Sequence, residues 1–402
     1  MKMRDKRLLV LGAGRGQIGL YKAARKMGIT TIAITLPDNN PPCLSLADEV
    51  CYANIANPDE VETNTSGLVF DGVVTCCLDM GLRSLGRLCD KYSLRGYSES
   101  IAELCNDKFR MKQHLEECGV NTASFRQIGS EQELLEAVGE VGDYPVIIKA
   151  TDLAGSKGIY KAENRDEALS GFRRAMRDTR KDYLIVEKFL QGREFGAQAF
   201  VANGELLFVM PHGDLLYHAA TAVPVGHYVP FDCDVKMREK IESETRKAIF
   251  ALGLDNCAVN IDFIEENGKV YVLELSGRAG ANCLPELTSI HYGLEYYELI
   301  VAASLGLDVR EIWNKRGVER ITGISKMIIS PDKSGILENI TYQGEKFPYI
   351  YDMTFFVEKG QDVHKFENSG HCLAQVVVSG SDYEECEGRI NDVMKQIVID
   401  ID

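Results

Sequence analysis

The sequence lacks any apolar run long enough to cross a membrane. Its basic first residues are followed by an apolar run that ends at Gly12. That run is too short for the core of a signal peptide and is better explained as a first β-strand. We therefore expect a cytoplasmic protein with no membrane partner.

Positive charge is also scarce, with 45 lysines and arginines against 60 aspartates and glutamates and a net charge of −15. Such a balance argues against a nucleic-acid or anionic-membrane surface. The twelve cysteines include no C-x-x-C pair and no metal-finger spacing. We expect most of them to be small core residues in a reducing compartment.

Several common catalytic and nucleotide-binding motifs are absent. The chain has no G-x-S-x-G, no H-E-x-x-H and no Walker G-x-x-x-x-G-K-[ST] motif. The glycine-rich turn over residues 12–19 has Gln17 where a dinucleotide-binding turn needs glycine. We favour a turn that starts a helix close to the sheet, with the helix N-terminus facing a substrate anion. Dinucleotide binding is the less favoured alternative.

The chain of 402 residues is long enough for two or three domains, and no internal repeat is evident. Strands expected over residues 7–12, 30–35 and 72–75 alternate with helices, and this order predicts a doubly wound parallel α/β domain. Helices are expected over 98–105 and 107–118, with Asn106 as the N-cap between them. Residues 320–402 alternate short strands and turns before a helix over 383–396 and predict an α+β lobe.

The most informative stretch is residues 258–275, where two apolar runs flank the turn sequence Glu-Glu-Asn-Gly. This pattern predicts a β-hairpin whose strands carry one acid each, Asp262 and Glu274. The acids fall nearly opposite one another and can face one cation, for which oxygen ligands suit Mg²⁺. Alternatively, one acid faces solvent and the other caps a loop, and the spacing alone leaves both interpretations open.

A second stretch places Lys149 at the end of an apolar strand, followed by a loop of small residues over 152–158 and a returning strand over 159–162. Such a loop can act as a flap whose backbone amides and Ser156 hydroxyl surround phosphate oxygens. A plain surface hairpin would have a similar sequence. The stretch by itself does not distinguish the two.

Taken in order along the chain, these features resemble the ATP-grasp superfamily. They are Asn106-Asp107-Lys108, Lys149, the loop over 155–158, Glu187-Lys188-Phe189-Leu190 with Glu194, Asp262, Glu274 and Arg278. The resemblance implies an α/β and α+β fold with three parts: a pre-ATP-grasp domain over 1–96, ATP-grasp lobes over 97–310, and a C-terminal α+β lobe over 311–402. Within the ATP-grasp lobes it places a flap-bearing lobe at about 123–190 and a metal-site lobe at about 191–310.

The resemblance implies ATP and Mg²⁺, or Mn²⁺ in its place, as cofactors. It assigns the nucleotide to Lys108, Lys149, Gly155, Ser156, Gly158, Glu187, Lys188, Leu190 and Glu194. It assigns the metal to Asp262, Glu274 and Ser276, although many members have asparagine where this chain has Ser276. It makes Arg278, Lys149 and Glu274 the catalytic residues, with Arg278 holding the reacting carboxylate and phosphate.

Within the superfamily, the chain is most similar to carboxylate–amine ligases of the L-amino acid ligase branch. Arg278 is followed by Ala-Gly-Ala-Asn-Cys-Leu-Pro-Glu-Leu rather than by the Gln-Val-Glu-His of biotin carboxylases. The resemblance implies an amide formed between small amino-acid-like substrates through an acyl phosphate, with release of ADP and phosphate. The alternatives are a formate-dependent glycinamide ribonucleotide transformylase-like enzyme and a non-catalytic ATP-binding sensor.

The region over 212–230 is expected to be a loop near the acyl phosphate, flanked by His212, His218 and His227. We name His218 as the histidine that contacts substrate, together with Arg278. A structural hydrogen bond is the more usual role of a loop histidine. The expected partners are small carboxylates and amines, and a homodimer is compatible with this interpretation.

Overall fold

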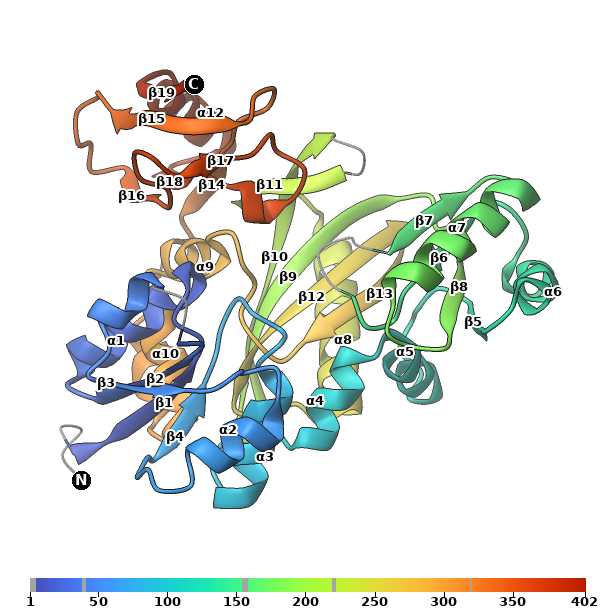
Figure 1. Ribbon diagram of the computed structural model, residues 1–402, viewed down its shortest axis with the longest axis horizontal. Helices are drawn as coiled ribbons and strands as arrows, with labels where there is room; N and C mark the ends of the chain where they lie inside the picture. Colours follow the sequence, from blue (N-terminus) through green and yellow to red (C-terminus); the bar gives the residue numbers. More distant parts are fainter. Residues whose placement is uncertain (1–4, 38–40, 154–157, 219–221, 319) are drawn as a thin grey trace.

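The structure is a computed structural model that describes residues 5–37, 41–153, 158–218, 222–318 and 320–402, with backbone alone at 218 and 222. Among these residues the strands form four sheets. The fold is mixed α/β, as the sequence predicted, and its lobes surround a long curved sheet (Figure 1). No helix in the described part of the chain combines the length and apolar character needed to cross a membrane.

The N-terminal domain contains a four-stranded parallel sheet of order β3-β2-β1-β4. Its strands are β1 (Arg7–Leu11), β2 (Thr30–Thr35), β3 (Glu49–Tyr52) and β4 (Gly72–Val74), and its helices are α1 (Ile18–Met27), α2 (Pro58–Asn64), α3 (Leu82–Tyr92) and the short η2 (Arg15–Gln17) and η3 (Pro42–Ser45). The three strands expected from the sequence are confirmed. β3 is an exposed edge strand, so it has no apolar run to reveal it.

Two helices connect this domain to the next lobe: α4 (Glu99–Asn106) and α5 (Lys108–Glu117). The prediction that Asn106 caps the second helix was wrong, because Asn106 ends α4 and Asp107 is the cap. The Asp107 carboxylate accepts hydrogen bonds from the amides of Phe109 and Arg110 at 3.1 and 3.2 Å. An ionised cap also suits the positive end of the helix dipole. Lys108 is consequently the first residue of α5.

The lobe that is predicted to carry a flap contains a four-stranded antiparallel sheet of order β5-β8-β6-β7. Its strands are β5 (Phe125–Ile128), β6 (Val146–Lys149), β7 (Ile159–Ala162) and β8 (Leu184–Lys188), with helices α6 (Glu131–Val141) and α7 (Arg165–Asp178). Lys149 pairs with Ile159 across β6 and β7. The loop over 152–158 therefore joins two antiparallel strands, as predicted, and does not lead into a helix.

An eight-stranded sheet of order β13-β12-β9-β10-β11-β14-β18-β16 runs through the rest of the molecule. The strands are β9 (Arg193–Ala202), β10 (Glu205–His218), β11 (Ala222–Val229), β12 (Cys257–Glu266), β13 (Lys269–Ser276), β14 (Thr322–Ile328), β16 (Ile350–Phe355) and β18 (Ala374–Gly380). β11 pairs with β14. The sheet thus crosses from the lobe that carries the acids into the C-terminal lobe, over the boundary expected near residue 310.

The expected loop over 212–230 was wrong, because this region forms the two paired strands β10 and β11. Pro224 and Gly226 both lie within β11. Pro224 lies next to the irregularity in register at Leu215 and Leu216. A Cβ on Gly226 would lie 2.1 Å from the Ser325 carbonyl oxygen, so glycine permits the close approach of β14.

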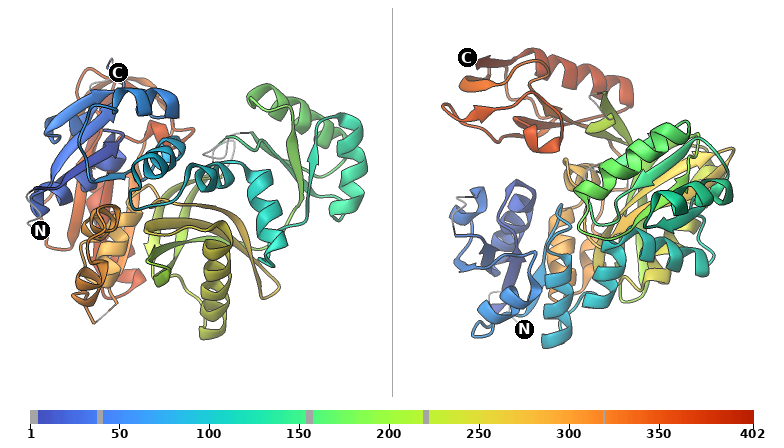
Figure 2. Two further views of the ribbon diagram at one scale, coloured as in Figure 1. Left: turned by 90° about the horizontal axis from the view of Figure 1, so that it is seen from below. Right: turned by 45° about the vertical axis from the view of Figure 1, so that its right-hand side comes forward.

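The C-terminal lobe adds a small sheet of order β17-β15-β19 and a covering helix (Figure 2). Its elements are β15 (Gly335–Tyr342), β17 (Asp362–Val363), β19 (Ile397–Ile401), α12 (Tyr383–Lys395) and the short η4 (Ser369–His371). The predicted final helix is confirmed to within a residue. Four further helices pack around the large sheet: α8 (Val235–Leu252), α9 (Leu284–Tyr292), α10 (Tyr296–Ser304) and α11 (Val309–Asn314).

The N-terminal domain is anchored by helix α10, whose buried face belongs to the same hydrophobic core as α1 and β1. Tyr297 lies so close to α1 that a Cβ on Gly19 would be 2.1 Å from its ring. This packing brings the carboxyl ends of the parallel strands toward β12 and β13. The candidate site is assembled there.

Candidate active site

The two acids predicted to face one another do so. Asp262 on β12 and Glu274 on β13 are register partners, so their side chains leave the same face of the sheet. Burial, and after it the charge of Glu274, raises the pKa of Asp262 to about 8. A divalent cation between the two oxygens would remove that penalty, and the donor set is the one Mg²⁺ prefers.

Lys108 neutralises the second acid. Its Nζ lies 3.0 Å from Glu274 Oε2 and donates to the Leu153 carbonyl at 2.8 Å. The charge of Lys108 keeps the pKa of Glu274 below its usual value. Since Lys108 is the first residue of α5, its amine is held beside the acid pair and at the root of the loop over 152–158.

A second lysine and a buried acid form a further cluster. Lys149 Nζ donates to Glu187 Oε2 at 2.8 Å, and the other Glu187 oxygen lies 3.3 Å from the amine of Lys112. Glu187 is 1% exposed, and its pKa is lowered because the two lysines outweigh burial. Lys112 was not predicted, although it follows Lys108 by one helical turn on α5.

Arg278 is held by a residue that the sequence analysis missed. Asp79 follows β4, and its carboxylate accepts two hydrogen bonds from the Arg278 guanidinium, at 2.8 Å from Nε and 2.7 Å from Nη2. The same carboxylate accepts the Ser276 hydroxyl at 2.7 Å. Asp79 lies beyond the carboxyl end of a parallel strand, where functional residues of α/β sheets gather, and that position was the available signal.

The remaining predicted nucleotide residues lie at the ends of β7, β8 and β9. Gly158 has φ +67°, and a Cβ there would lie 2.8 Å from the Ala150 side chain, so the loop closes only with glycine. Lys188 ends β8 and donates its amide to Ser124 at 2.9 Å. Leu190 is buried, whereas Glu194 is exposed at the start of β9. Gly155 and Ser156 lie outside the described residues.

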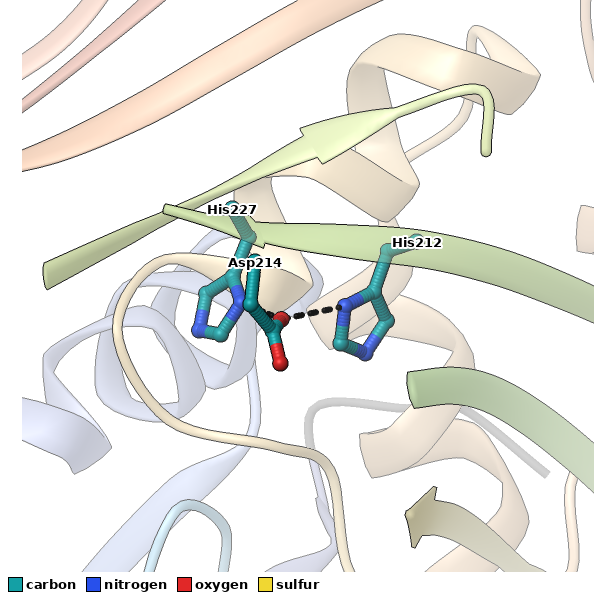
Figure 3. Close-up of side chains that lie close together, drawn as sticks. All are labelled: His212, Asp214 and His227. Atoms are coloured by element: carbon teal, nitrogen blue, oxygen red, sulfur yellow. Dashed lines mark hydrogen bonds and ion pairs between the residues drawn. The ribbon is translucent and has the colours of Figure 1, made fainter. Parts of the chain in front are cut away.

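The histidine region brings together His212, Asp214 and His227, whose side chains meet on one face of β10 and β11 (Figure 3). His212 and His227 were named from the sequence, but Asp214 was not. His218, predicted to contact substrate, ends β10, and its side chain lies outside the described residues.

A cavity of about 580 Å³ opens beside the glycine-rich turn and is lined from three parts of the chain. Gly14, Arg15 and Lys22 line it from the N-terminal domain, Glu286 from α9, and Phe356 from the C-terminal lobe. Burial raises the pKa of Glu286 to about 7, and Tyr297 donates to it at 2.8 Å. The volume is sufficient for a small organic ligand.

Two family profiles match parts of the chain. The phosphoribosylglycinamide synthetase ATP-grasp (A) domain matches residues 106–218, and the L-amino acid ligase C-terminal domain 2 matches residues 327–402. The first match contains Lys108, Lys149 and Glu187. The second covers most of the C-terminal lobe.

Among solved structures, phosphoribosylglycinamide synthetase from Anaerococcus prevotii is 48% identical, with a TM-score of 0.88 over 99% of this chain and 100% of that chain. L-amino acid ligase from Bacillus licheniformis has the same fold at 18% identity, with a TM-score of 0.82 over 99% of each chain. The carbamoyl phosphate synthase large chain from Clostridium beijerinckii is 23% identical over 77% of this chain. That match spans only 30% of the much longer relative.

Proposed function

Because this chain belongs to the ATP-grasp family of carboxylate–amine ligases, we propose that it joins two small amino-acid-like molecules by an amide bond. The carboxylate of one substrate would first take the γ-phosphoryl group of ATP. The amine of the other would then attack the acyl phosphate, releasing phosphate, with ADP as the second product. The observation that carries this proposal is the convergence of Asp262, Glu274, Lys108 and the Asp79–Arg278 pair at one edge of the sheet.

The residues fit the electrostatic demands of phosphoryl transfer, which needs positioning and charge neutralisation more than a covalent nucleophile. Lys108 and Lys149 would contact the phosphates of the substrate ATP. Acids hold both amines, Glu274 that of Lys108 and Glu187 that of Lys149. Glu187, with the backbone of Lys188 and Leu190, would form the adenine pocket, and Glu194 would hold the ribose hydroxyls.

Asp262 and Glu274 are the residues that would hold Mg²⁺ or Mn²⁺, with the Ser276 hydroxyl as a further candidate ligand. The ion would neutralise the charge of the phosphate oxygens. Ser276 donates its hydroxyl hydrogen to Asp79, which leaves the lone pairs of the hydroxyl oxygen available to a metal ion. Glu274 has two functions in this arrangement, because it also holds Lys108 in place.

Arg278 would bind the carboxylate that becomes phosphorylated. Its guanidinium already holds one carboxylate, that of Asp79, in a bidentate arrangement, and a substrate carboxylate has the same shape and charge. The cavity beside the glycine-rich turn would accept the amine substrate. The profile match of the C-terminal lobe supports amino acids as substrates, since that lobe contributes Phe356 to the cavity wall.

A second candidate is supported by the relative from Anaerococcus prevotii, which is 48% identical over nearly the whole chain. If this chain shares the activity for which that protein is named, the amine would be a phosphorylated ribosylamine and the carboxylate would be glycine. Arg15 and Lys22 at the cavity wall would then face the phosphate. Both candidates share the acyl phosphate and differ in the amine.

The test is positional isotope exchange in ATP labelled at the β,γ-bridging oxygen, with Mg²⁺ and each carboxylate alone. Exchange with an amino acid, before any amine is added, is the expected result. ADP release on adding a panel of amino acids or phosphoribosylamine then identifies the amine. Exchange only with formate would favour the transformylase-like alternative. ATP binding without exchange or ADP release would favour the non-catalytic ATP-binding sensor. AMP as a product would contradict both ligase candidates.

A further inference from the structure

Three side chains meet on β10 and β11, outside the residues given a role above. Asp214 Oδ1 lies 2.7 Å from His227 Nδ1 and 3.2 Å from His212 Nδ1. One ligand-type atom from each residue lies within 4.8 Å of the other two. The two histidines are 2% and 5% exposed. The cluster is compact and largely closed to water.

The sheet register explains why these side chains converge. His212 and Asp214 are two residues apart on β10, so they leave the same face. His227 is the register partner of Asp214 on β11. His212 itself is opposite Gly196 of β9, and Gly196 is opposite Asp262. The cluster and the acid pair therefore share one face of the sheet and are separated by the strand β9.

Gly196 provides the space for the His212 ring. A Cβ on Gly196 would lie 2.3 Å from His212 Cε1, so the ring lies over β9 where another residue would place a side chain. A larger residue at 196 would push His212 out of the cluster. The glycine thus serves to let the imidazole approach the acid pair.

His212 is incompletely satisfied in this arrangement. Neither of its ring nitrogens has a well-directed hydrogen-bond partner among the described residues, although both are buried. A buried polar atom without a partner costs about 1–3 kcal/mol. A neutral imidazole offers the lone pair of one ring nitrogen to a metal ion.

We propose that His212, Asp214 and His227 bind a divalent transition-metal ion, for which Zn²⁺ is the best match. Two imidazoles and one carboxylate suit Zn²⁺, whereas Mg²⁺ prefers oxygen ligands alone. Zn²⁺ lies about 2 Å from such ligands and keeps them roughly 3–3.5 Å apart, close to the distances seen here. Three protein ligands leave a fourth position open, which is the pattern of zinc sites that bind water or substrate.

The first test uses the full chain, freed of metal with a chelator and without ATP or substrates, so it does not depend on the proposed ligase function. Titration with Zn²⁺ should show one tight site per chain. Co²⁺ in its place should give visible bands of a nitrogen and oxygen site without a thiolate charge-transfer band. That band separates the cluster from the twelve cysteines. Absence of binding, or a thiolate band, would overturn the proposal.

The second test compares variants. Asp214→Asn and His227→Gln should each raise the Kd for Zn²⁺ by more than about 100-fold, because removing even a hydrogen-bonding partner of a metal ligand costs roughly 10- to 100-fold. His291→Gln removes a buried histidine outside the cluster and should leave the Kd unchanged. Asp262→Asn should also leave it unchanged. If it abolishes Zn²⁺ binding instead, the ion lies at the acid pair and the proposal is wrong.

A thermal measurement covers variants that fold poorly. Zn²⁺ should raise the Tm of the unmodified chain, because a ligand that binds only the folded state stabilises it. The same Zn²⁺ should leave the Tm of Asp214→Asn unchanged, whatever its starting value. An equal shift in both proteins would place the ion elsewhere and overturn the assignment.

Discussion

The hairpins β12–β13 and β10–β11 each place an aspartate on the same face of one sheet. The pKa values of these two carboxylates are shifted in opposite directions. Asp262 has another acid as its register partner, and burial with that charge raises its pKa to about 8. Asp214 has two imidazoles beside it, and they hold its pKa well below the usual range. Burial acts on both in the same direction, so the partner side chain decides the charge state.

This comparison assigns different tasks to the hairpins. The acid pair needs a cation and suits a hard ion that binds with phosphate. In the histidine cluster the two imidazoles offset the charge of the carboxylate, and the ring nitrogens of His212 lack a well-directed hydrogen-bond partner among the described residues. Changes at the acid pair should therefore have the largest effect on activity, and a change at a buried histidine outside both hairpins the smallest.

The largest effect is expected from the acid pair. Glu274→Ala removes a proposed metal ligand and the partner of Lys108, so kcat should fall by about 1,000-fold or more through lost stabilisation of transition-state charge. Steady-state ADP release with the substrates found by isotope exchange is the measurement. Glu239→Ala, an exposed acid on α8, is the matched control and should leave kcat unchanged. A loss confined to the KM for ATP would contradict the assigned role.

A smaller effect is expected at the residue that holds the arginine. Asp79→Ala removes two hydrogen-bond acceptors of the Arg278 guanidinium and leaves only the Ala279 carbonyl among the described residues, so the side chain is less firmly positioned, and kcat should fall about 10- to 100-fold. Asp79→Asn keeps one acceptor oxygen and should have an intermediate effect. The KM for the carboxylate should change less than kcat. An unchanged or higher kcat would mean that Asp79 only occupies Arg278 until substrate binds.

A change at Glu194, the proposed ribose-binding residue, should weaken ATP binding without slowing the chemical step. Glu194→Ala removes a proposed acceptor for the ribose hydroxyls, so the KM for ATP should rise roughly 10-fold, the cost of losing one hydrogen bond to a charged group. The value of kcat should stay within about twofold. Glu194 is exposed, so its loss should leave the Tm unchanged. An effect on kcat equal to that of Glu274→Ala would contradict the assignment of nucleotide binding to Glu194 and of the chemical step to Glu274.

The last prediction concerns stability, with no effect on kcat. His291 is a buried histidine whose Nδ1 faces the Ile321 carbonyl at 3.1 Å, and burial lowers its pKa to about 4. Between that pH and the ordinary value of 6.5, the unfolded chain binds a proton that the folded chain excludes. The free energy of unfolding should therefore fall as the pH drops through this window, by up to roughly 3 kcal/mol.

His291→Gln should flatten that part of the stability curve, and urea unfolding at pH 4.5, 5.5 and 7 would measure the change. An unaltered curve would show that other groups control acid unfolding. The result also provides a reference for His212 and His227, because it reports a buried imidazole whose ring contact is a backbone carbonyl.

Several elements of the fold followed from local pattern. Residues 258–275 have two apolar runs around Glu-Glu-Asn-Gly, and a turn of that kind sets the register that pairs Asp262 with Glu274. Lys149 could be placed at a strand end because the apolar run before it is unbroken. By contrast, β3 has exposed, partly charged residues and left no signal. The strand β11 was missed, and its partner β14 lies far along the chain, so the pairing leaves no local pattern.

The sequence by itself determined many of the local elements, the hairpin that carries Asp262 and Glu274, and the order of charged residues along the chain. These depend on turn geometry and on contacts between residues close in sequence. Only the tertiary structure decided that Asp79 holds Arg278, which lies 199 positions further along the chain. The same is true of Lys112 with Glu187, and of Gly196, whose missing side chain admits the His212 ring. Each of these contacts joins separate elements, and the packing that brings them together leaves no repeating pattern in the sequence of either one.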